Sequence, residues 1–161
     1  MDDFYLRMAE NYGSWVVHLS AVFGLLVGSF LNVVIYRLPV MMERESTLLA
    51  KEHLAIEPTE AERQPFSLTK PASRCPKCGH AVKPWQNIPV VSYLLLRGKC
   101  GHCRTPISMR YPAIEILTAC MFAAVAVRYG WSWLTLAGLV FTAMLIALTF
   151  IDADKIGRAH V

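Results

Sequence analysis

The sequence predicts an all-α polytopic membrane protein with about three transmembrane helices and a small loop domain between the first and the second. Hydrophobic residues make up 55% of the chain and charged residues only 17%, a balance typical of integral membrane proteins. Two long runs, residues 14–36 and 131–151, contain no Asp, Glu, Lys or Arg. Between them lie two close cysteine pairs, which indicate that the loop domain is a zinc-knuckle fold.

The first run, residues 14–36, is predicted to be transmembrane helix 1. Its 23 residues are enough to cross the roughly 30 Å hydrocarbon layer at about 1.5 Å per residue. The preceding segment, residues 1–13, carries three acids against one arginine, whereas a cleaved signal peptide needs a positive start. We therefore expect this helix to remain in the mature protein.

Two further spans are predicted after the loop. Residues 111–127 are apolar except for Glu115 and form transmembrane helix 2. A short turn at residues 128–130, flanked by aromatic side chains typical of a membrane interface, leads into transmembrane helix 3 at residues 131–151. The two spans should pack as a helical hairpin.

The distribution of charge predicts which way the protein faces. The loop at residues 37–110 holds 12 Lys and Arg against 6 Asp and Glu, whereas residues 1–13 have a net charge of −2. Because positive loops stay on the cytoplasmic side, we expect the loop in the cytosol, and the N-terminus and residues 128–130 outside. This orientation, beside anionic lipid, also accounts for the net charge of +4 without a nucleic-acid partner.

The loop contains two Cys-x-x-Cys knuckles separated by 21 residues, formed by Cys75, Cys78, Cys100 and Cys103. Two turns that each present a pair of thiolates can close a tetrahedron around one structural zinc ion. A pair of disulfides is the alternative, but a cytosolic loop is kept reduced. His80 and His102 are weaker candidates as replacement ligands, since four thiolates already complete the shell.

The rest of the loop has less specific signals. Gly79 follows the first knuckle and Gly101 sits within the second, where a tight turn needs a positive φ. Residues 85–96 are apolar for a soluble loop, so they either pack on the knuckles or lie at the bilayer surface. Residues 43–70 are predicted to form a short amphipathic helix and then a linker.

Several polar or small residues interrupt the spans. Gly24, Gly28 and Asn32 are four apart and share one helix face, which favours close helix packing with a hydrogen bond across it. Glu115 lies near a membrane boundary, where a carboxylate needs a partner such as Arg110 or Arg37. Structural and functional roles for Glu115 both remain open. Cys120 is interpreted as a small packing residue.

Two acids, Asp152 and Asp154, follow the third span directly. Residues 152–155 are predicted to begin a loop where the helix meets the cytosol. Acids at a helix end are usually solvated, so their position alone favours a boundary role over catalysis.

Several segments occur in the order seen in type IV prepilin peptidases. They are residues 28–39, the two knuckles, residues 87–93, residues 110–115 and residues 151–154. The chain closely resembles the N-terminal half of a type IV prepilin peptidase / N-methyltransferase, a member of the prepilin leader peptidase family. These segments are spread along almost the whole sequence.

The resemblance implies an aspartic endopeptidase of the bacterial inner membrane. Such enzymes remove the leader of type IV prepilins and type II secretion pseudopilins on the cytoplasmic side, and then methylate the new N-terminus with S-adenosylmethionine. By resemblance, Asp152 is the first catalytic aspartate, with Asp154 as the fallback. Arg37 and Glu115 are candidate contacts for S-adenosylmethionine. Two close carboxylates that share one proton can serve as base and acid in such a reaction.

The family's second aspartate belongs to a Gly-x-Gly-Asp motif, which this sequence does not contain. Residues 156–161 also match the translation of a common sequencing-adapter string, so we expect a nonnative tail there and give His160 no functional weight. The fragment by itself is then expected to lack peptidase activity. A noncatalytic membrane adaptor with a zinc-binding cytosolic module is the alternative function.

Overall fold

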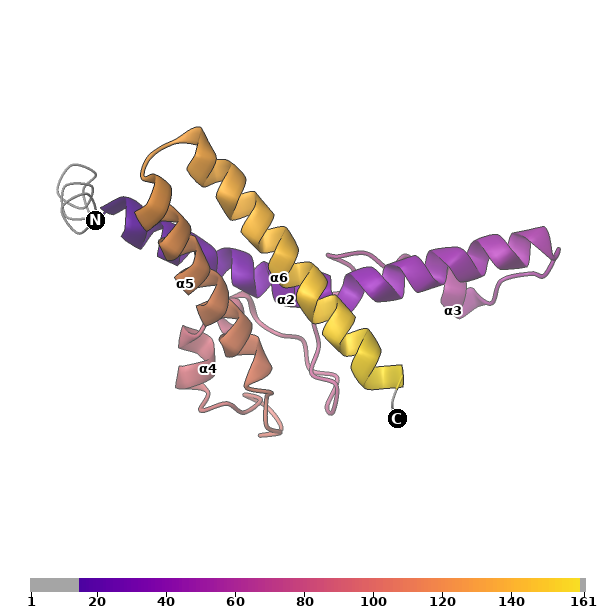
Figure 1. The fold of residues 1–161 in the computed structure, drawn as a ribbon. Coiled ribbons are helices and arrows are strands. Elements are labelled where there is room, and N and C mark those ends of the chain that lie inside the picture. Colours follow the sequence, from indigo (N-terminus) through magenta and orange to yellow (C-terminus); the bar gives the residue numbers. More distant parts are fainter. Residues whose placement is uncertain (1–14, 160–161) are drawn as a thin grey trace.

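The computed structural model describes residues 15–159. Its long helices are α2 (Trp15–His53), α5 (Arg110–Tyr129) and α6 (Trp133–Ala159). The short elements are α3 (Glu60–Arg63), the 3-10 helix η1 (Pro84–Asn87) and α4 (Val91–Leu95), and the described part of the chain contains no strand. Figure 1 shows α5 and α6 as a hairpin beside the first part of α2, whose second part extends beyond it.

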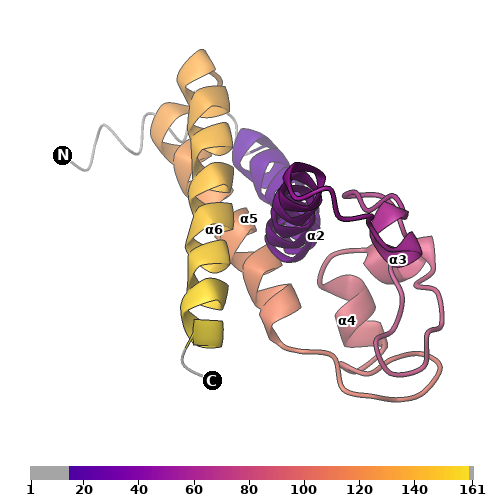
Figure 2. The ribbon, with the colours of Figure 1, turned by 90° about the vertical axis from the view of Figure 1, so that its right-hand side faces the viewer.

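The three long helices are each long and apolar enough to cross a membrane. This confirms the predicted all-α fold with about three transmembrane helices. Figure 2, which views α2 nearly end-on, shows α2 between α6 on one side and the loop segments with α3 and α4 on the other. The predicted segment at residues 1–13 lies outside the described residues, as does the end of the predicted tail.

The first helix is much longer than the sequence predicted. We expected a span ending at residue 36 and a separate amphipathic helix, but α2 continues as one element through Pro39 to His53. Residues 40–53 are mostly Met, Glu, Arg, Leu, Ala and Lys, which are strong helix formers, so the helix propagates into the polar region. The loop therefore starts only after His53.

The helix α6 also continues beyond its predicted end. Residues 152–155, which were predicted to begin a loop, remain helical in the structure. Asp152 and Asp154 are two residues apart and therefore point about 200° apart around the helix axis. The two acids consequently meet different surroundings.

Helices α2 and α5 pack closely at two glycines. A Cβ atom placed on Gly24 would lie 2.7 Å from Ala119 Cα, and one placed on Gly28 would lie 2.7 Å from Glu115 Cα. Such distances are too short for real carbon atoms, so only glycine allows the two backbones to approach this far. The predicted small-residue contact is confirmed, and α5 is the partner.

Asn32 extends the same contact by one turn. Its Nδ2 donates to the carbonyl oxygen of Tyr111 on α5 at 3.1 Å and to that of Gly28 at 3.2 Å. This confirms the predicted hydrogen bond between the helices. The bond joins α2 to the start of α5 at a second point, one helical turn beyond Gly28.

The buried apolar core lies where the three helices meet near the loop. It consists of Leu31, Ile35, Ile114, Ile146 and Ile151. In contrast, most large apolar side chains of the helices point outward, as expected for helices surrounded by lipid. The prediction that Cys120 is a packing residue was wrong, because its side chain lies on the exposed face of α5. Periodicity alone could not distinguish the two faces of an apolar helix.

We predict that Gly28→Ala destabilises the helix bundle. The added methyl group would collide with the α5 backbone, which cannot rotate away as a side chain can, so a loss of about 1–3 kcal/mol is expected. Gly138→Ala is the comparison variant, because the nearest atoms that its Cβ would meet, the first at 2.8 Å, belong to the side chain of Val125 and not to the backbone. Thermal unfolding in detergent micelles measures both, and equal stability of Gly28→Ala and wild type would contradict the contact.

Candidate functional site

The four predicted cysteine ligands come together in the structure. The Sγ atoms of Cys75, Cys78, Cys100 and Cys103 all lie within 4.8 Å of one another. The Sγ atoms of Cys75 and Cys103 are 3.7 Å apart. Zinc–sulfur bonds of about 2.3 Å place two tetrahedral ligands about 3.8 Å apart, whereas a disulfide requires about 2.05 Å. The cluster therefore has the chemistry and the spacing of a four-thiolate metal site.

The two knuckles have the same backbone hydrogen bonds. In the first, the Cys75 N–H donates to His80 O and the Gly79 N–H donates to Cys75 O, both at 2.9 Å. In the second, the corresponding Arg104 N–H donates to Cys100 O at 3.0 Å. Each knuckle is thus a turn that closes on its own first cysteine. These turns present the two thiols of each pair on the same side of the knuckle.

The residue after each second cysteine has a positive φ. It is Gly79 in the first knuckle, with φ 68°, and Arg104 in the second, with φ 60°. The prediction that Gly101 serves this purpose in the second knuckle was wrong. The two knuckles are equivalent position by position, so the left-handed residue follows the cysteine pair, whichever amino acid stands there.

Hydrogen bonds prepare some of these thiols for metal binding. The hydroxyl and then the N–H of Thr105 lower the pKa of Cys103 to about 6. The N–H of Cys78 is the largest cause of a lowered pKa at Cys75. The N–H of His80 also favours the thiolate of Cys78, but burial and the neighbouring thiols outweigh it and raise the pKa of Cys78 to about 11. Four thiolates this close repel one another unless a cation lies between them.

The two histidines of the knuckles contact each other. The rings of His80 and His102 are stacked, with centroids 4.7 Å apart and an interplanar angle of 12°. Among the described residues, the cluster of ligand atoms contains the four cysteines and neither histidine. The stack therefore packs the two knuckles together from outside the ligand set.

The acids at the end of α6 have different environments. Arg110, at the start of α5, forms a two-pronged ion pair with Asp154, with N–O distances of 2.5 and 2.8 Å. Its guanidinium also lies 5.4 Å from the ring centroid of Phe150. Asp152 is exposed at the same end of the bundle. Asp154 thus joins two helices, while the carboxylate of Asp152 faces outward.

Arg37 is buried and binds the loop backbone. It donates to the carbonyl oxygens of Ser67 at 2.8 Å, Leu68 at 3.3 Å and Pro71 at 2.7 Å. Phe66 lies against the same guanidinium, with its ring centroid 5.6 Å away. A residue considered for cofactor contact from the sequence therefore fastens the returning loop to α2.

Glu115 is also buried, and its partner was not among those predicted. Neither Arg110 nor Arg37 pairs with it, because Arg110 binds Asp154 and Arg37 binds backbone carbonyls. Instead, Glu115 Oε2 accepts the N–H of Val90 at 2.7 Å. Sequence reasoning missed this contact because a backbone N–H carries no residue-specific signal. Glu115 thereby joins α5 to the segment between the knuckles.

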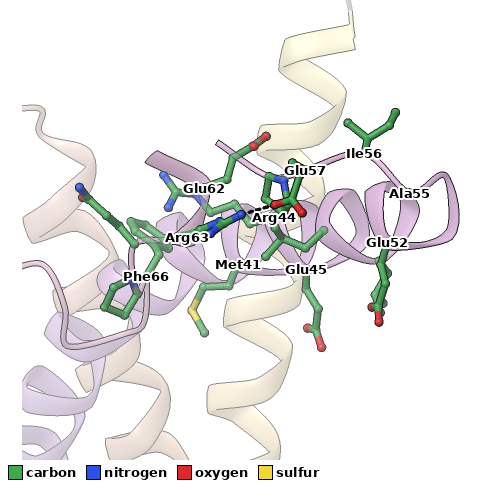
Figure 3. Close-up of a pocket in the computed structure, with 15 residues that line it drawn as sticks. Met41, Arg44, Glu45, Glu52, Ala55, Ile56, Glu57, Glu62, Arg63 and Phe66 are labelled. Atoms are coloured by element: carbon green, nitrogen blue, oxygen red, sulfur yellow. Dashed lines mark hydrogen bonds and ion pairs between the residues drawn. The ribbon is translucent and has the colours of Figure 1, made fainter. Parts of the chain in front are cut away.

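A cavity of about 890 Å³ lies between the extension of α2 and the segment around α3 (Figure 3). Arg63 pairs with Glu57 across it, and Lys51 pairs with Glu62 at 2.6 Å. The Lys51 ammonium, followed by Thr59, lowers the pKa of Glu62 to about 2. None of the site residues predicted from the sequence lines this cavity. These ion pairs thus hold the cavity walls together. The cavity is separate from the residues predicted to act in catalysis or metal binding.

We predict that Gly79→Ala weakens the first knuckle through backbone strain alone. A Cβ atom there would meet nothing within 4 Å, so the cost of about 1–2 kcal/mol arises from the positive φ. Gly101→Ala is the control, since Gly101 has no positive φ and its nearest neighbour is the flexible side chain of Gln86. A chelator competition assay on the metal-loaded protein should show faster metal release from Gly79→Ala than from Gly101→Ala. The reverse order would refute the strain argument.

Comparison with known proteins gives consistent matches. The family described as the bacterial peptidase A24 N-terminal domain matches residues 22–129. A protein of Neisseria gonorrhoeae named prepilin leader peptidase/N-methyltransferase is 64% identical over 140 residues, which are 87% of this chain and 49% of that protein. A protein of the same name from Pseudomonas aeruginosa is 50% identical over 135 residues, or 84% of this chain and 46% of that protein.

The matched region includes both knuckles, the contact of α2 with α5 and the start of α5. A third relative of the same name, from Pseudomonas putida, is 49% identical over 94% of this chain and 51% of its own length. The chain spans about half the length of the curated relatives it matches. No solved structure matches the chain. Because the family match covers more than half of the sequence, the chain belongs to the bacterial peptidase A24 N-terminal domain family.

Proposed function

We propose that the chain is the N-terminal part of a membrane enzyme that removes the leader peptide of type IV prepilins and type II secretion pseudopilins. In the same enzyme, the new N-terminus is then N-methylated. The observation that carries this proposal is the 64% identity, over most of the chain, to a protein named prepilin leader peptidase/N-methyltransferase. Both relatives are named for two enzymatic activities, so the alternative function, a noncatalytic membrane adaptor, is not favoured.

Peptide cleavage would use Asp152 as one member of a pair of carboxylates. Its exposure at the loop end of α6 supports this role, because a catalytic group must reach the substrate. Asp154, the fallback, is engaged by Arg110 in an ion pair between two helices. A second carboxylate near Asp152 would share its proton, so that one acid activates water and the other protonates the scissile carbonyl.

The ion pair of Arg110 with Asp154 would serve as a positioning contact. It ties the end of α6 to the start of α5. Arg110 also reaches the carbonyl oxygen of Phe150 at 3.5 Å. Together these contacts would fix the position of Asp152 at the loop end of the helix bundle.

The cysteine cluster would hold one structural zinc ion. Four thiolates complete a tetrahedral shell and leave no open position for a substrate or a water molecule. Zinc would therefore stabilise the loop rather than take part in cleavage. It would also join the two knuckles, which are separated by 21 residues in the sequence.

Methyl transfer with S-adenosylmethionine rests on the relatives' names. Arg37 and Glu115 remain the candidate contacts from the sequence, but backbone groups of the loop engage both side chains. Neither candidate side chain is therefore free of contacts within the protein. We therefore assign no step of methyl transfer to them.

The protein would lie in the bacterial inner membrane with its loop in the cytoplasm. The excess of positive charge in residues 37–110 supports this orientation. The pairing of Arg110 with Asp154 puts the end of α6 on the same side as the loop. Asp152 would then face the compartment in which prepilins carry their leader peptides.

We predict that Asp152→Asn in a full-length chain lowers prepilin cleavage by about 10²- to 10⁴-fold, since an amide cannot transfer the proton. Asp154→Asn should lower cleavage by less than about tenfold, because a partly exposed ion pair contributes about 1 kcal/mol or less. Cleavage of a prepilin in isolated membranes measures both variants, with protein abundance checked by immunoblot.

Undiminished cleavage by Asp152→Asn would remove this residue from the catalytic role. A complete loss in Asp154→Asn together with normal activity in Asp152→Asn would assign catalysis to the fallback. Normal activity in both variants would reject the aspartic mechanism for this segment.

We predict one zinc ion per chain in the purified protein, lost on Cys75→Ser. Removing one of four ligands opens the shell, so the metal should dissociate at low chelator concentration. Cys120→Ser is the control, because Cys120 lies on α5 outside the cluster. Metal content is measured by inductively coupled plasma mass spectrometry. Metal-free wild-type protein, or equal loss in both variants, would reject the site.

A further inference from the structure

The short helix α4 exposes an apolar face beside the helix bundle. Leu94 and Leu95 are 67% and 71% exposed, and Val91 lies on the same face one turn earlier. Trp85 and Ile88 of the preceding segment are exposed as well. Five large apolar side chains within eleven residues are unusual on a surface in contact with water.

The orientation of α4 is fixed by contacts on its opposite face. Tyr93 Oη lies 2.9 Å from the sulfur of Met109 and donates to Ile107 O at 3.4 Å. Val90, just before the helix, has a φ of 57°, which is strained for a β-branched residue. Glu115 accepts its N–H in this conformation. These contacts therefore hold the apolar face of α4 outward and prevent the helix from turning about its axis.

The contact with Glu115 places α4 at the level of the membrane boundary. Glu115 is five residues into α5, about 7.5 Å along the axis from Arg110. All 20 residues of α5 are needed to cross a hydrocarbon layer of about 30 Å. In Figures 1 and 2, α4 accordingly lies beside the lower part of α5 rather than beyond its end.

The surroundings of this face are positively charged. Residues 64–114 contain eight Lys and Arg and no Asp or Glu. Arg97, Lys99 and Arg104 line a cavity of about 390 Å³ together with Leu95 and Leu96. A basic rim next to an apolar face is complementary to anionic lipid, in which phosphate lies above acyl chains.

We propose that η1 and α4 form an interfacial membrane anchor. The apolar face of α4 enters the leaflet on the loop side, and the neighbouring basic side chains bind anionic phospholipid headgroups. The cysteine cluster is thereby held against the membrane, next to the start of α5. This inference is independent of the proposed enzymatic function, because it rests on the level of α4, its fixed orientation and the charge around it.

The test uses photocrosslinking in lipid nanodiscs that contain phosphatidylglycerol. Leu94 and Leu95 are replaced, one at a time, by p-benzoylphenylalanine, and adducts are identified by mass spectrometry. Leu54 is the control position, since it is 68% exposed but lies about 25 Å beyond Arg37 along α2. We expect lipid adducts at positions 94 and 95, at least several-fold more than at position 54.

Adducts to protein at positions 94 and 95 would overturn the proposal and show that a polypeptide covers this face. Equal lipid yields at all three positions would overturn it too, because they would mean unspecific labelling. In nanodiscs of phosphatidylcholine alone, we expect a lower lipid yield at position 95. An unchanged yield there would reject the binding of anionic headgroups.

Discussion

The close approach of α2 and α5 at Gly24 and Gly28 determines much of this structure. Because each glycine faces an α5 backbone atom that a methyl group would strike, the two helices have one favourable register. That register brings Asn32 to the Tyr111 carbonyl and sets the height of Glu115 on the bundle. Glu115 then binds Val90, so the position of the segment between the knuckles follows from a contact inside the membrane-spanning part.

Arg37, Arg110 and Glu115, at the loop end of the bundle, each join segments that are distant in sequence. Arg37 binds three carbonyls of the returning loop, Arg110 joins α5 to Asp154 on α6, and Glu115 binds a backbone N–H. A charge near a lipid boundary is costly unless it has partners, and these partners come from segments distant in sequence. The cost of an unpaired charge therefore helps to keep the loop attached to the helices. Asp152 remains exposed among these engaged groups.

The cluster of four cysteines shows how much of a site the local sequence pattern can predict. The spacing of the cysteines was sufficient to predict that four thiols converge, because each pair needs only one tight turn. From the sequence we expected Gly101 to have the positive φ of the second knuckle, whereas Arg104 has it. The error arose because glycine permits a positive φ but does not require one, and the position in the turn decides. Similarly, the helix boundary at residue 36 followed hydropathy, whereas backbone propensity carried α2 to His53.

Residue order alone was enough to predict the membrane-spanning helices, the thiol cluster and the glycine contact, since each depends on composition or on spacing within one segment. Only the folded chain decided that Arg110 binds Asp154, that Glu115 binds Val90 and that α4 lies beside the lower part of α5. These contacts join residues from 25 to 44 positions apart. Which residues form these contacts depends on the register between helices and, for Glu115, on a backbone N–H. A backbone group is common to nearly all residues, so the sequence gives no signal for it.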